Sequence, residues 1–214
     1  MKAKLSTKVV LSGITAALLG LSTMSAVAAD SAATIAKNGL AELAKGVYST
    51  GPNGEKAAAA SSLTFSKDEL AKLKKMKATA AISFHLTSDW TSGQQAGLTK
   101  RFNELGIKIV GVTQADFKAD VQVSQIQTLM AKKPNILVSI PVDGKATSEA
   151  YKAAAAAGAK IVFMDNTAAG LTVGKDYVSV VSADNYANGA ASAYLLGREL
   201  NGKGTIALIY HAAD

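Results

Sequence analysis

Residues 160–166 read KIVFMDN, and this stretch decides the fold. Four apolar residues in succession, 161–164, are typical of a strand buried on both faces, as in a parallel sheet covered by helices. The run ends in Asp165 and Asn166, and no helical pattern follows directly. Two side chains that bind polar groups therefore stand at the end of a buried strand.

Apolar runs of the same kind recur along the chain, and helical patterns lie between most of them. In 91–106, for example, Leu98, Phe102 and Leu105 share one helical face. Between 164 and 177 we expect a glycine-containing loop in place of a helix. Strand–helix repeats of this kind predict an α/β fold with a doubly wound parallel sheet. The other predicted strands are 78–84, 107–112, 135–140, 177–181 and 205–210.

The first 29 residues have the pattern of a secretory signal. Three lysines precede a short apolar core, and Ala26-Val27-Ala28 fits the small-x-small pattern at a cleavage site. The alternative is a membrane anchor, but the apolar core is short for a bilayer span. We predict a cleavable signal peptide at 1–29, a periplasmic location, and no stable membrane insertion after cleavage.

Composition excludes several classes of protein. The chain has no cysteine, so it forms no disulfide or thiolate metal site and lacks the cysteine that a bacterial lipoprotein needs. Its net charge of +7 falls to +4 without the lysines of 1–29, which leaves 20 basic against 16 acidic residues. The one basic run, 72–77, is typical of a solvated helix face, so no nucleic-acid partner is expected.

Between the signal and the first strand lies an extension, residues 30–77. Its first part, 31–47, has helical spacing, and 48–62 is turn-rich and then low in complexity, as in a linker. A second helix is expected after Ser66, whose side chain suits the N-cap position. The predicted organisation is a signal peptide at 1–29, this extension at 30–77, an α/β lobe at 78–203 and the start of another unit at 204–214.

The carboxyl ends of parallel strands are where ligands bind, and every predicted strand here ends near an aspartate. Two of them, Asp143 and Asp184, have an alternative role as helix caps. Trp90 has the alternative of packing against its own helix. The candidate ligand-binding residues are Ser88, Asp89, Trp90, Asp143, Asp165, Asn166 and His211.

These residue types suit a polyhydroxylated ligand. Carboxylates accept hydroxyl hydrogens, amides donate and accept, and an aromatic ring covers the C–H face of a sugar. Catalysis is not supported, because no activated nucleophile or nucleotide-binding motif is found, and we predict no enzyme. His85 and His211 form no close-spaced metal motif, so neither a metal nor another cofactor is expected.

From about residue 78 onward the sequence resembles the sugar-type, ribose-binding-like (type 1) periplasmic binding proteins of ABC importers. Three stretches carry this resemblance: 80–113, 136–166 and 178–200. It implies a two-lobed fold whose ligand bridges the lobes, with Trp90, Asp165 and Asn166 as contacts from the first lobe. Members of the family often have arginine where Asn166 stands, and a neutral amide there argues against an acidic sugar.

The resemblance also implies that the chain stops just inside the second lobe, so we expect a truncated form with the second lobe mostly missing. It implies a monomer that passes a sugar or polyol to a membrane permease. The alternative is a ligand-sensing module for a sensor kinase or chemoreceptor. An exported enzyme and a transcriptional regulator of the same fold are disfavoured by the missing catalytic residues and by the export signal, respectively.

Overall fold

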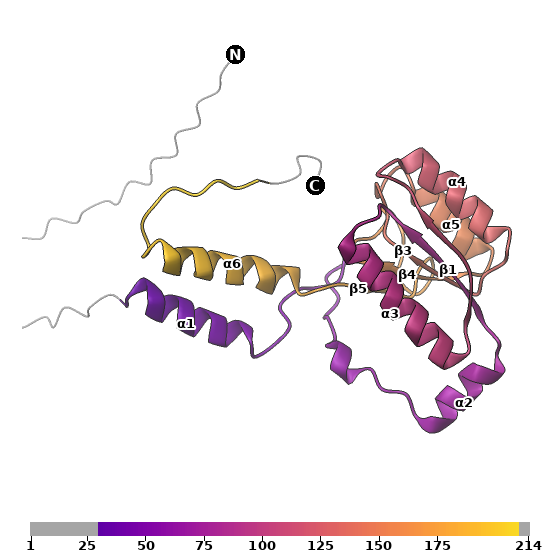
Figure 1. Ribbon diagram of the computed structural model, residues 1–214, viewed down its shortest axis with the longest axis horizontal. Helices are drawn as coiled ribbons and strands as arrows, with labels where there is room; N and C mark the ends of the chain where they lie inside the picture. Colours follow the sequence, from indigo (N-terminus) through magenta and orange to yellow (C-terminus); the bar gives the residue numbers. More distant parts are fainter. Residues whose placement is uncertain (1–29, 210–214) are drawn as a thin grey trace, which may run out of the picture.

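A five-stranded parallel sheet forms the centre of the computed structural model, which describes residues 30–209 (Figure 1). The strand order is β2-β1-β3-β4-β5, which confirms the predicted α/β fold. The predicted signal peptide and His211 lie outside the described residues. The strands are β1 (Thr79–Phe84), β2 (Lys108–Gln114), β3 (Ile136–Ser139), β4 (Lys160–Met164) and β5 (Ser179–Val181).

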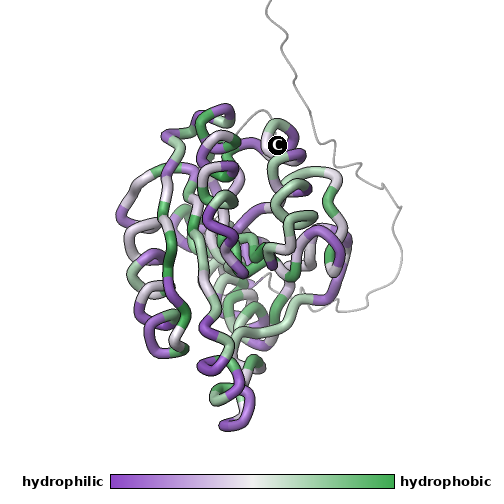
Figure 2. The backbone as a smooth tube through the Cα atoms, turned by 90° about the vertical axis from the view of Figure 1, so that its right-hand side faces the viewer, coloured by the Kyte–Doolittle hydropathy of each residue, from purple (hydrophilic) through white to green (hydrophobic). Residues whose placement is uncertain are grey.

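Helices cover both faces of this sheet. Leu70 of α2 and Leu98 and Phe102 of α3 pack on one face, whereas Ile126 of α4 and Tyr151 of α5 pack on the other. The colouring of the helices by hydropathy alternates along their length, as expected for amphipathic helices (Figure 2). The helices are α1 (Ala32–Leu43), α2 (Lys67–Lys75), α3 (Asp89–Leu105), α4 (Ala119–Met130), α5 (Ser148–Ala156) and α6 (Asn185–Glu199), with a short 3₁₀ turn, η1 (Ala60–Ser62).

The core consists of two apolar layers separated by the sheet. In β1, Ala81 joins the layer under α4 and α5, while Ala80 and Ile82 join the layer under α3. Because successive side chains of a strand point to opposite faces, a strand buried on both sides must be apolar throughout. This explains why the sequence shows continuous apolar runs rather than alternation.

Local signals explain where the helices begin and end. Ser66 caps α2 and Ser88 caps α3, each in a reciprocal capping box, with Glu69 and Thr91 respectively. The cap at Ser88 starts α3 at Asp89, two residues before the predicted start at 91. Gly106 ends α3 with a left-handed backbone, as its position after the apolar face predicts.

The connection from β4 to β5 contains no helix in the structure, as the sequence predicts. Residues 165–178 form turns, and Ala168, Leu171 and Tyr177 are buried against the layer under α4 and α5. Since a loop rather than a helix follows β4, the side chains of Asp165 and Asn166 are not needed as helix caps.

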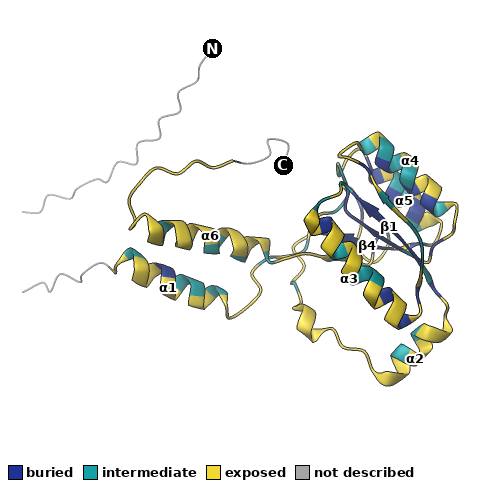
Figure 3. Ribbon diagram, viewed as in Figure 1, coloured by how far each residue is buried: buried dark blue, intermediate teal, exposed yellow. Residues whose placement is uncertain are grey.

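Helices α1 and α6 form a separate pair beside the sheet (Figure 1). Although its sequence continues the strand–helix repeat, α6 does not cover the sheet. Apart from Ala36, the pair has no buried residue (Figure 3). At Gly39 of α1 the contact is close: an added Cβ would lie 2.3 Å from the ring of Tyr194. The helical spacing of 31–47 is confirmed by α1, which packs on α6.

The predicted sixth strand is wrong within the described residues. Residues 205–209 form no strand, and Ile206, Leu208 and Ile209 are highly exposed. An apolar run of this kind becomes a strand only if another strand pairs with its backbone, and no described strand lies beside this segment. Local β propensity is not sufficient to form a strand by itself.

The structure describes six α-helices between residues 30 and 209. None of the helices in this range combines the length and the hydropathy that crossing a bilayer requires.

A buried amide holds the segment that follows β3. The side chain of Gln122, in α4, is fully buried. Its Nε2 donates to the carbonyl oxygen of Ile140 at 2.8 Å, and its Oε1 accepts from the backbone N–H of Val142 at 2.7 Å. Because Pro141 between them has no N–H, Gln122 binds the polar backbone groups on both sides of the proline.

We predict that Gln122→Leu lowers the free energy of unfolding by about 3 kcal/mol, because two buried backbone groups lose their partner. Gln127→Leu, on the exposed side of the same helix, should change it by less than about 0.5 kcal/mol. Urea unfolding of both variants tests this. Equal stabilities of the two variants would contradict the role of Gln122.

Candidate functional site

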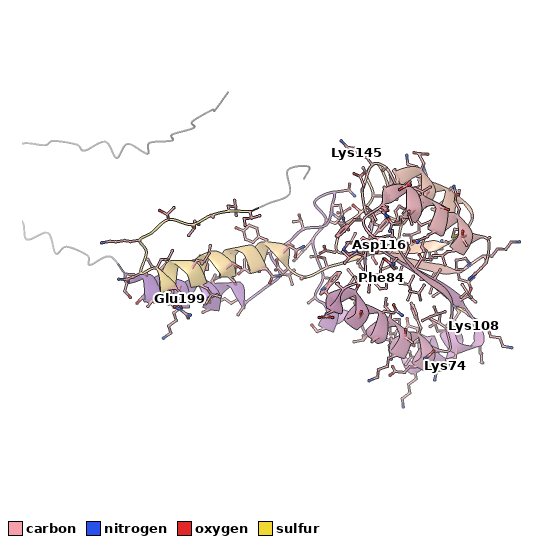
Figure 4. All side chains as sticks on the ribbon, turned by 45° about the horizontal axis from the view of Figure 1, so that its top comes forward. Lys74, Phe84, Lys108, Asp116, Lys145 and Glu199 are labelled. Atoms are coloured by element: carbon pink, nitrogen blue, oxygen red, sulfur yellow. The ribbon has the colours of Figure 1, made fainter. Side chains whose placement is uncertain are left out.

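The carboxyl ends of the five strands lie along one edge of the sheet, because all five strands are parallel. Figure 4 shows Phe84 and Asp116, at the ends of β1 and β2, on the side facing α6, whereas Lys108, at the start of β2, lies on the far side. From β1 the chain adds β2 on one side, and it then adds β3, β4 and β5 on the other side. The point between β1 and β3, where the strand order reverses, is a switch point of the kind at which ligands bind.

Asp165 is held at this edge with an uncommon backbone. Its φ is +68°, in the left-handed region that non-glycine residues seldom adopt. Its N–H donates to the carbonyl oxygen of Val181 at 2.9 Å, which fixes this geometry. Such backbone strain is found preferentially at functional sites.

One of the two oxygens of the Asp165 carboxylate accepts hydrogen bonds from neighbouring side chains. Its Oδ1 accepts from the hydroxyl of Ser182 at 3.2 Å and from Nδ2 of Asn185 at 3.4 Å, and Asn185 also donates to Ser182 at 3.2 Å. Within residues 30–209, Oδ2 accepts no hydrogen bond from a side chain. The exposed carboxylate thus keeps an acceptor available for a ligand hydroxyl.

An aromatic cluster lies near Asp165. The ring of His85, directly after β1, packs edge-on against Trp90 at 6.4 Å and against Phe117 at 5.3 Å between centroids. Trp90 and Phe117 are 50% and 65% exposed, so both rings offer apolar surface outward. The structure therefore brings Trp90 and Asp165 to the same edge, with His85 as the shared neighbour.

His85 is the residue that connects the two parts of the site electrostatically. Burial lowers the pKa of its imidazole, and the nearby Asp165 carboxylate acts in the opposite direction. Its Nδ1 is buried and has no hydrogen-bond partner among the described residues. The neutral ring thus serves as a support for Trp90 and Phe117.

Sequence reasoning did not select Phe117, and it considered His85 only as a metal ligand. Phe117 depends on two successive left-handed residues, Asp116 at φ +49° and Phe117 itself at +58°. The N–H of Phe117 donates to the carbonyl oxygen of His85 at 2.9 Å, which ties the loop after β2 to the loop after β1. The only sequence signal was an aromatic residue in a polar stretch after a strand.

Ser88 and Asp89 lie at the start of α3, beside Trp90. The hydroxyl of Ser88 accepts from the N–H of Thr91 at 3.2 Å, so it is engaged as the helix cap. Asp89 is exposed in the first turn and lies with Trp90 at one end of a shallow groove along α3. Trp90 is thus placed by a capped helix start.

Asp143 follows β3 at the same edge, and its side chain has a local role. Its Oδ1 accepts from the N–H groups of Lys145 and Ala146, and both bonds lower the pKa of its carboxyl. The sequence left open that Asp143 caps a helix near Lys145. Asp143 instead bonds within the turn before α5, whose N-cap is Thr147. Its Oδ2 accepts no side-chain bond within the described range.

Asn166 is exposed next to Asp165, with its N–H bonded to the carbonyl oxygen of Met164. A metal site is not indicated in the part of the chain that the structure describes, since no group of three acidic or histidine residues gathers there. The edge instead combines a carboxylate, amides and a hydroxyl with exposed rings. This set can bind neutral hydroxyl groups while an aromatic face covers the adjacent C–H groups.

Solved structures of sugar-binding proteins are similar to this chain. A solute-binding protein of an ABC transporter from Agrobacterium vitis, bound with α-D-tagatopyranose, has a TM-score of 0.51 and 24% identity, with 56% of this chain and 43% of that chain covered. The myo-inositol binding protein of Caulobacter has a TM-score of 0.51 and 23% identity, with coverages of 57% and 40%.

A third similar structure is the fructose-binding periplasmic domain of a hybrid two-component system, with a TM-score of 0.52 and 16% identity over 59% of this chain and 41% of that one. At these identities the likeness shows the fold alone. The chain spans about two fifths of the length of these three structures. No curated protein matches the sequence.

Residues 80–214 match the sequence profile described as "Periplasmic binding protein domain". Members of this family are non-catalytic solute binders and are typically periplasmic. The matched range includes four of the five strands in full, β1 from its second residue, and every residue of the edge described above. It begins where the first of the three resembling stretches begins, at residue 80. The chain therefore belongs to the periplasmic binding protein domain family.

Proposed function

We propose that this chain binds a neutral sugar or polyol outside the cytoplasm for an ABC-type importer. The observation that carries this proposal is that the Trp90 ring and the Asp165 carboxylate lie at the same carboxyl edge of the sheet, where Trp90 packs on His85 and Asp165 acts on the charge of His85. A ring and a carboxylate acceptor in one place suit a molecule with both C–H and O–H groups. Two of the similar structures are bound with tagatopyranose and myo-inositol, which supports the same class of ligand.

A neutral ligand is favoured over an acidic sugar by the charges at the edge. Asp165 is ionisable and acidic, and its neighbours Asn166, Ser182 and Asn185 carry no charge. The lowered pKa keeps His85 uncharged at neutral pH. A carboxylate on the ligand would meet Asp165, and none of these three neighbours carries a positive charge to compensate, which costs binding energy.

A sensor module is the second candidate, because the fructose-binding domain of a two-component system has a similar fold. In either case the ligand is captured without being converted, and lobe 78–203 supplies one side of the site. The two candidates differ in their partner, a membrane permease or a signalling protein. The genes that neighbour the coding sequence distinguish them. We further propose export by the signal at 1–29 and a monomeric state.

Trp90 is the only tryptophan of the chain, so its fluorescence reports directly on the site. We predict a saturable change in emission on titration with neutral sugars or polyols such as tagatose, fructose and myo-inositol. Because the described residues contact a ligand from one side only, the dissociation constant should be millimolar, which is about −4 kcal/mol. Glucuronate should give no change. A saturable response to glucuronate alone would contradict the proposed ligand class.

We predict that Asp165→Asn weakens the binding of the best neutral ligand at least about tenfold, because an ionised acceptor bonds hydroxyls more strongly than an amide does. The matched control is Asp120→Asn, which removes the same charge from the exposed first turn of α4 and should leave the dissociation constant unchanged. Both are measured by the Trp90 titration. Equal effects of the two variants would remove Asp165 from the site.

The ionisation of His85 gives a prediction in pH. Its pKa is lowered from 6.5 by burial, so the unfolded chain binds more protons than the folded chain as pH falls below 6.5. The contribution of the neutral His85 ring to the free energy of unfolding is complete above pH 6.5. It is lost as the pH falls from 6.5 through the lowered pKa of the folded state. NMR titration of the His211→Gln variant, which retains His85 alone, should give a midpoint below 6.5.

Asp165→Asn should lower the His85 midpoint further, because the carboxylate favours the charged imidazole. A midpoint at or above 6.5 in the parent would contradict the buried placement of His85. If Asp165→Asn leaves the His85 midpoint unchanged, the Asp165 carboxylate does not affect the pKa of His85.

A further inference from the structure

A segment of the N-terminal extension, residues 47–56, connects the sheet with α6 without belonging to either. We call it the hinge strap. The only covalent link between β5 and α6 is 182–184, and the strap lies against its last residue, Asp184. In Figure 1 the exposed α1–α6 pair is drawn on one side of this point, and the rest of the lobe, which is the sheet with its flanking helices, is drawn on the other.

One end of the strap is bound by Asp184. The N–H of Tyr48 donates to Oδ2 of Asp184 at 2.6 Å, and the N–H and hydroxyl of Ser49 donate to Oδ1 at 3.0 and 2.8 Å. The same Oδ1 accepts from the N–H of Ala187 at 3.0 Å, which caps α6. These bonds lower the pKa of Asp184 to about 2, so it stays ionised across the physiological range.

Ser49 also binds the first turn of α6 directly. Its hydroxyl accepts from the N–H of Tyr186 at 3.1 Å, and the rings of Tyr48 and Tyr186 stack with centroids 6.3 Å apart. Ser49 is therefore bonded both to the cap of α6 and to its first turn. Each contact joins residues about 135 positions apart in the sequence.

The other end of the strap lies on the lobe. Thr50 and Lys56 form an antiparallel bridge, and Asn53 and Glu55 lie at its turn, beside Tyr177. Burial raises the pKa of the Tyr177 phenol, and the Glu55 carboxylate raises it further while a bond with Asn53 lowers it. Tyr177 is 4% exposed in the core layer under α4 and α5. The strap thus bonds to Asp184 and Tyr186 at one end and lies beside Tyr177 at the other.

That link is part of the candidate site. Ser182 and Asn185, on either side of Asp184, are the two residues that bond to Oδ1 of Asp165. Any rotation of 182–185 moves both of these donors relative to the carboxylate. The strap holds Asp184 and so restrains that rotation.

We propose that Tyr48 and Ser49 are positioning residues for the binding site, which hold segment 182–185 so that Ser182 and Asn185 stay bonded to Asp165. A ligand hydroxyl at Asp165 then meets a carboxylate whose orientation is already fixed, and binding requires less ordering. The same strap sets the resting angle between the sheet and α6. This inference rests on the proposed function only for its effect on ligand affinity.

The test uses Ser49→Ala in the full chain, which removes two of the bonds around Asp184 and Tyr186. The matched control is Ser66→Ala, which removes a serine cap with similar bonds to Glu69 at the start of α2. Because the chain has no cysteine, spin labels can be placed at Gln127→Cys on α4 and Ala193→Cys on α6, both exposed. A second, ligand-free readout is the side-chain amide resonance of Asn185.

We expect Ser49→Ala to broaden the distance distribution between the two labels, to shift the Asn185 side-chain resonance and to weaken sugar binding about five-fold, the usual effect of one hydrogen bond. Ser66→Ala should change none of these, and Ser49→Thr, which keeps the hydroxyl, should restore all of them. Ligand-free results for Ser49→Ala that equal those for Ser66→Ala would overturn the proposal.

Broadened distances with an unmoved Asn185 resonance would also overturn it, because the strap would then act on α6 without acting on the site. If no sugar binds the parent chain, the proposed function fails. The two ligand-free readouts still decide on the strap in that case, so the two failures are distinguishable.

Discussion

Parallel pairing of the strands is the constraint on which the rest of the structure depends. Once five strands run the same way, their carboxyl ends must share one edge, and the residues that follow each strand gather there whatever their separation in the sequence. His85, Phe117 and Asp165 follow three different strands, and the parallel pairing places all three at the same edge of the sheet. The pairing also brings helices onto the faces of the sheet, since consecutive parallel strands must be joined by long crossover connections, which are usually helices.

The edge is supported by bonds that the ligand does not need to supply. Gln122 fixes the segment leading to Asp143, the cap at Ser88 fixes the start of α3 beside Trp90, and the N–H of Asp165 is fixed by Val181. A site whose groups are already ordered loses less conformational entropy when a ligand binds. The left-handed backbones at Phe117 and Asp165 are restrained by the bonds of their N–H groups to the carbonyl oxygens of His85 and Val181.

The sequence was informative wherever a residue's role depends on near neighbours. The five strands of the sheet lie within two residues of their predicted bounds. The edge strands β2 and β5 contain no buried residue, whereas β1, β3 and β4 are largely buried and apolar, as strands covered on both faces must be. Trp90 and Asp165 were found because they follow such strands. Residues 205–209 have the same pattern but form no strand, since hydrogen-bond partners from another part of the chain decide that outcome. Phe117 needed two unusual backbone angles, and the contact of Ser49 with Asp184 has no local signal at all.

The glycine at position 39 has a consequence for how the two outer helices meet. The phenol ring of Tyr194 rests on bare backbone there, at a spacing that no other residue type permits. The Tyr194 ring occupies the space that a side chain at position 39 would fill, and this contact fixes the position of α1 along α6. A methyl group at position 39 would clash with the Tyr194 ring and push α1 away from α6. Because Tyr48 follows α1 in the chain, this shift of α1 would also displace Tyr48.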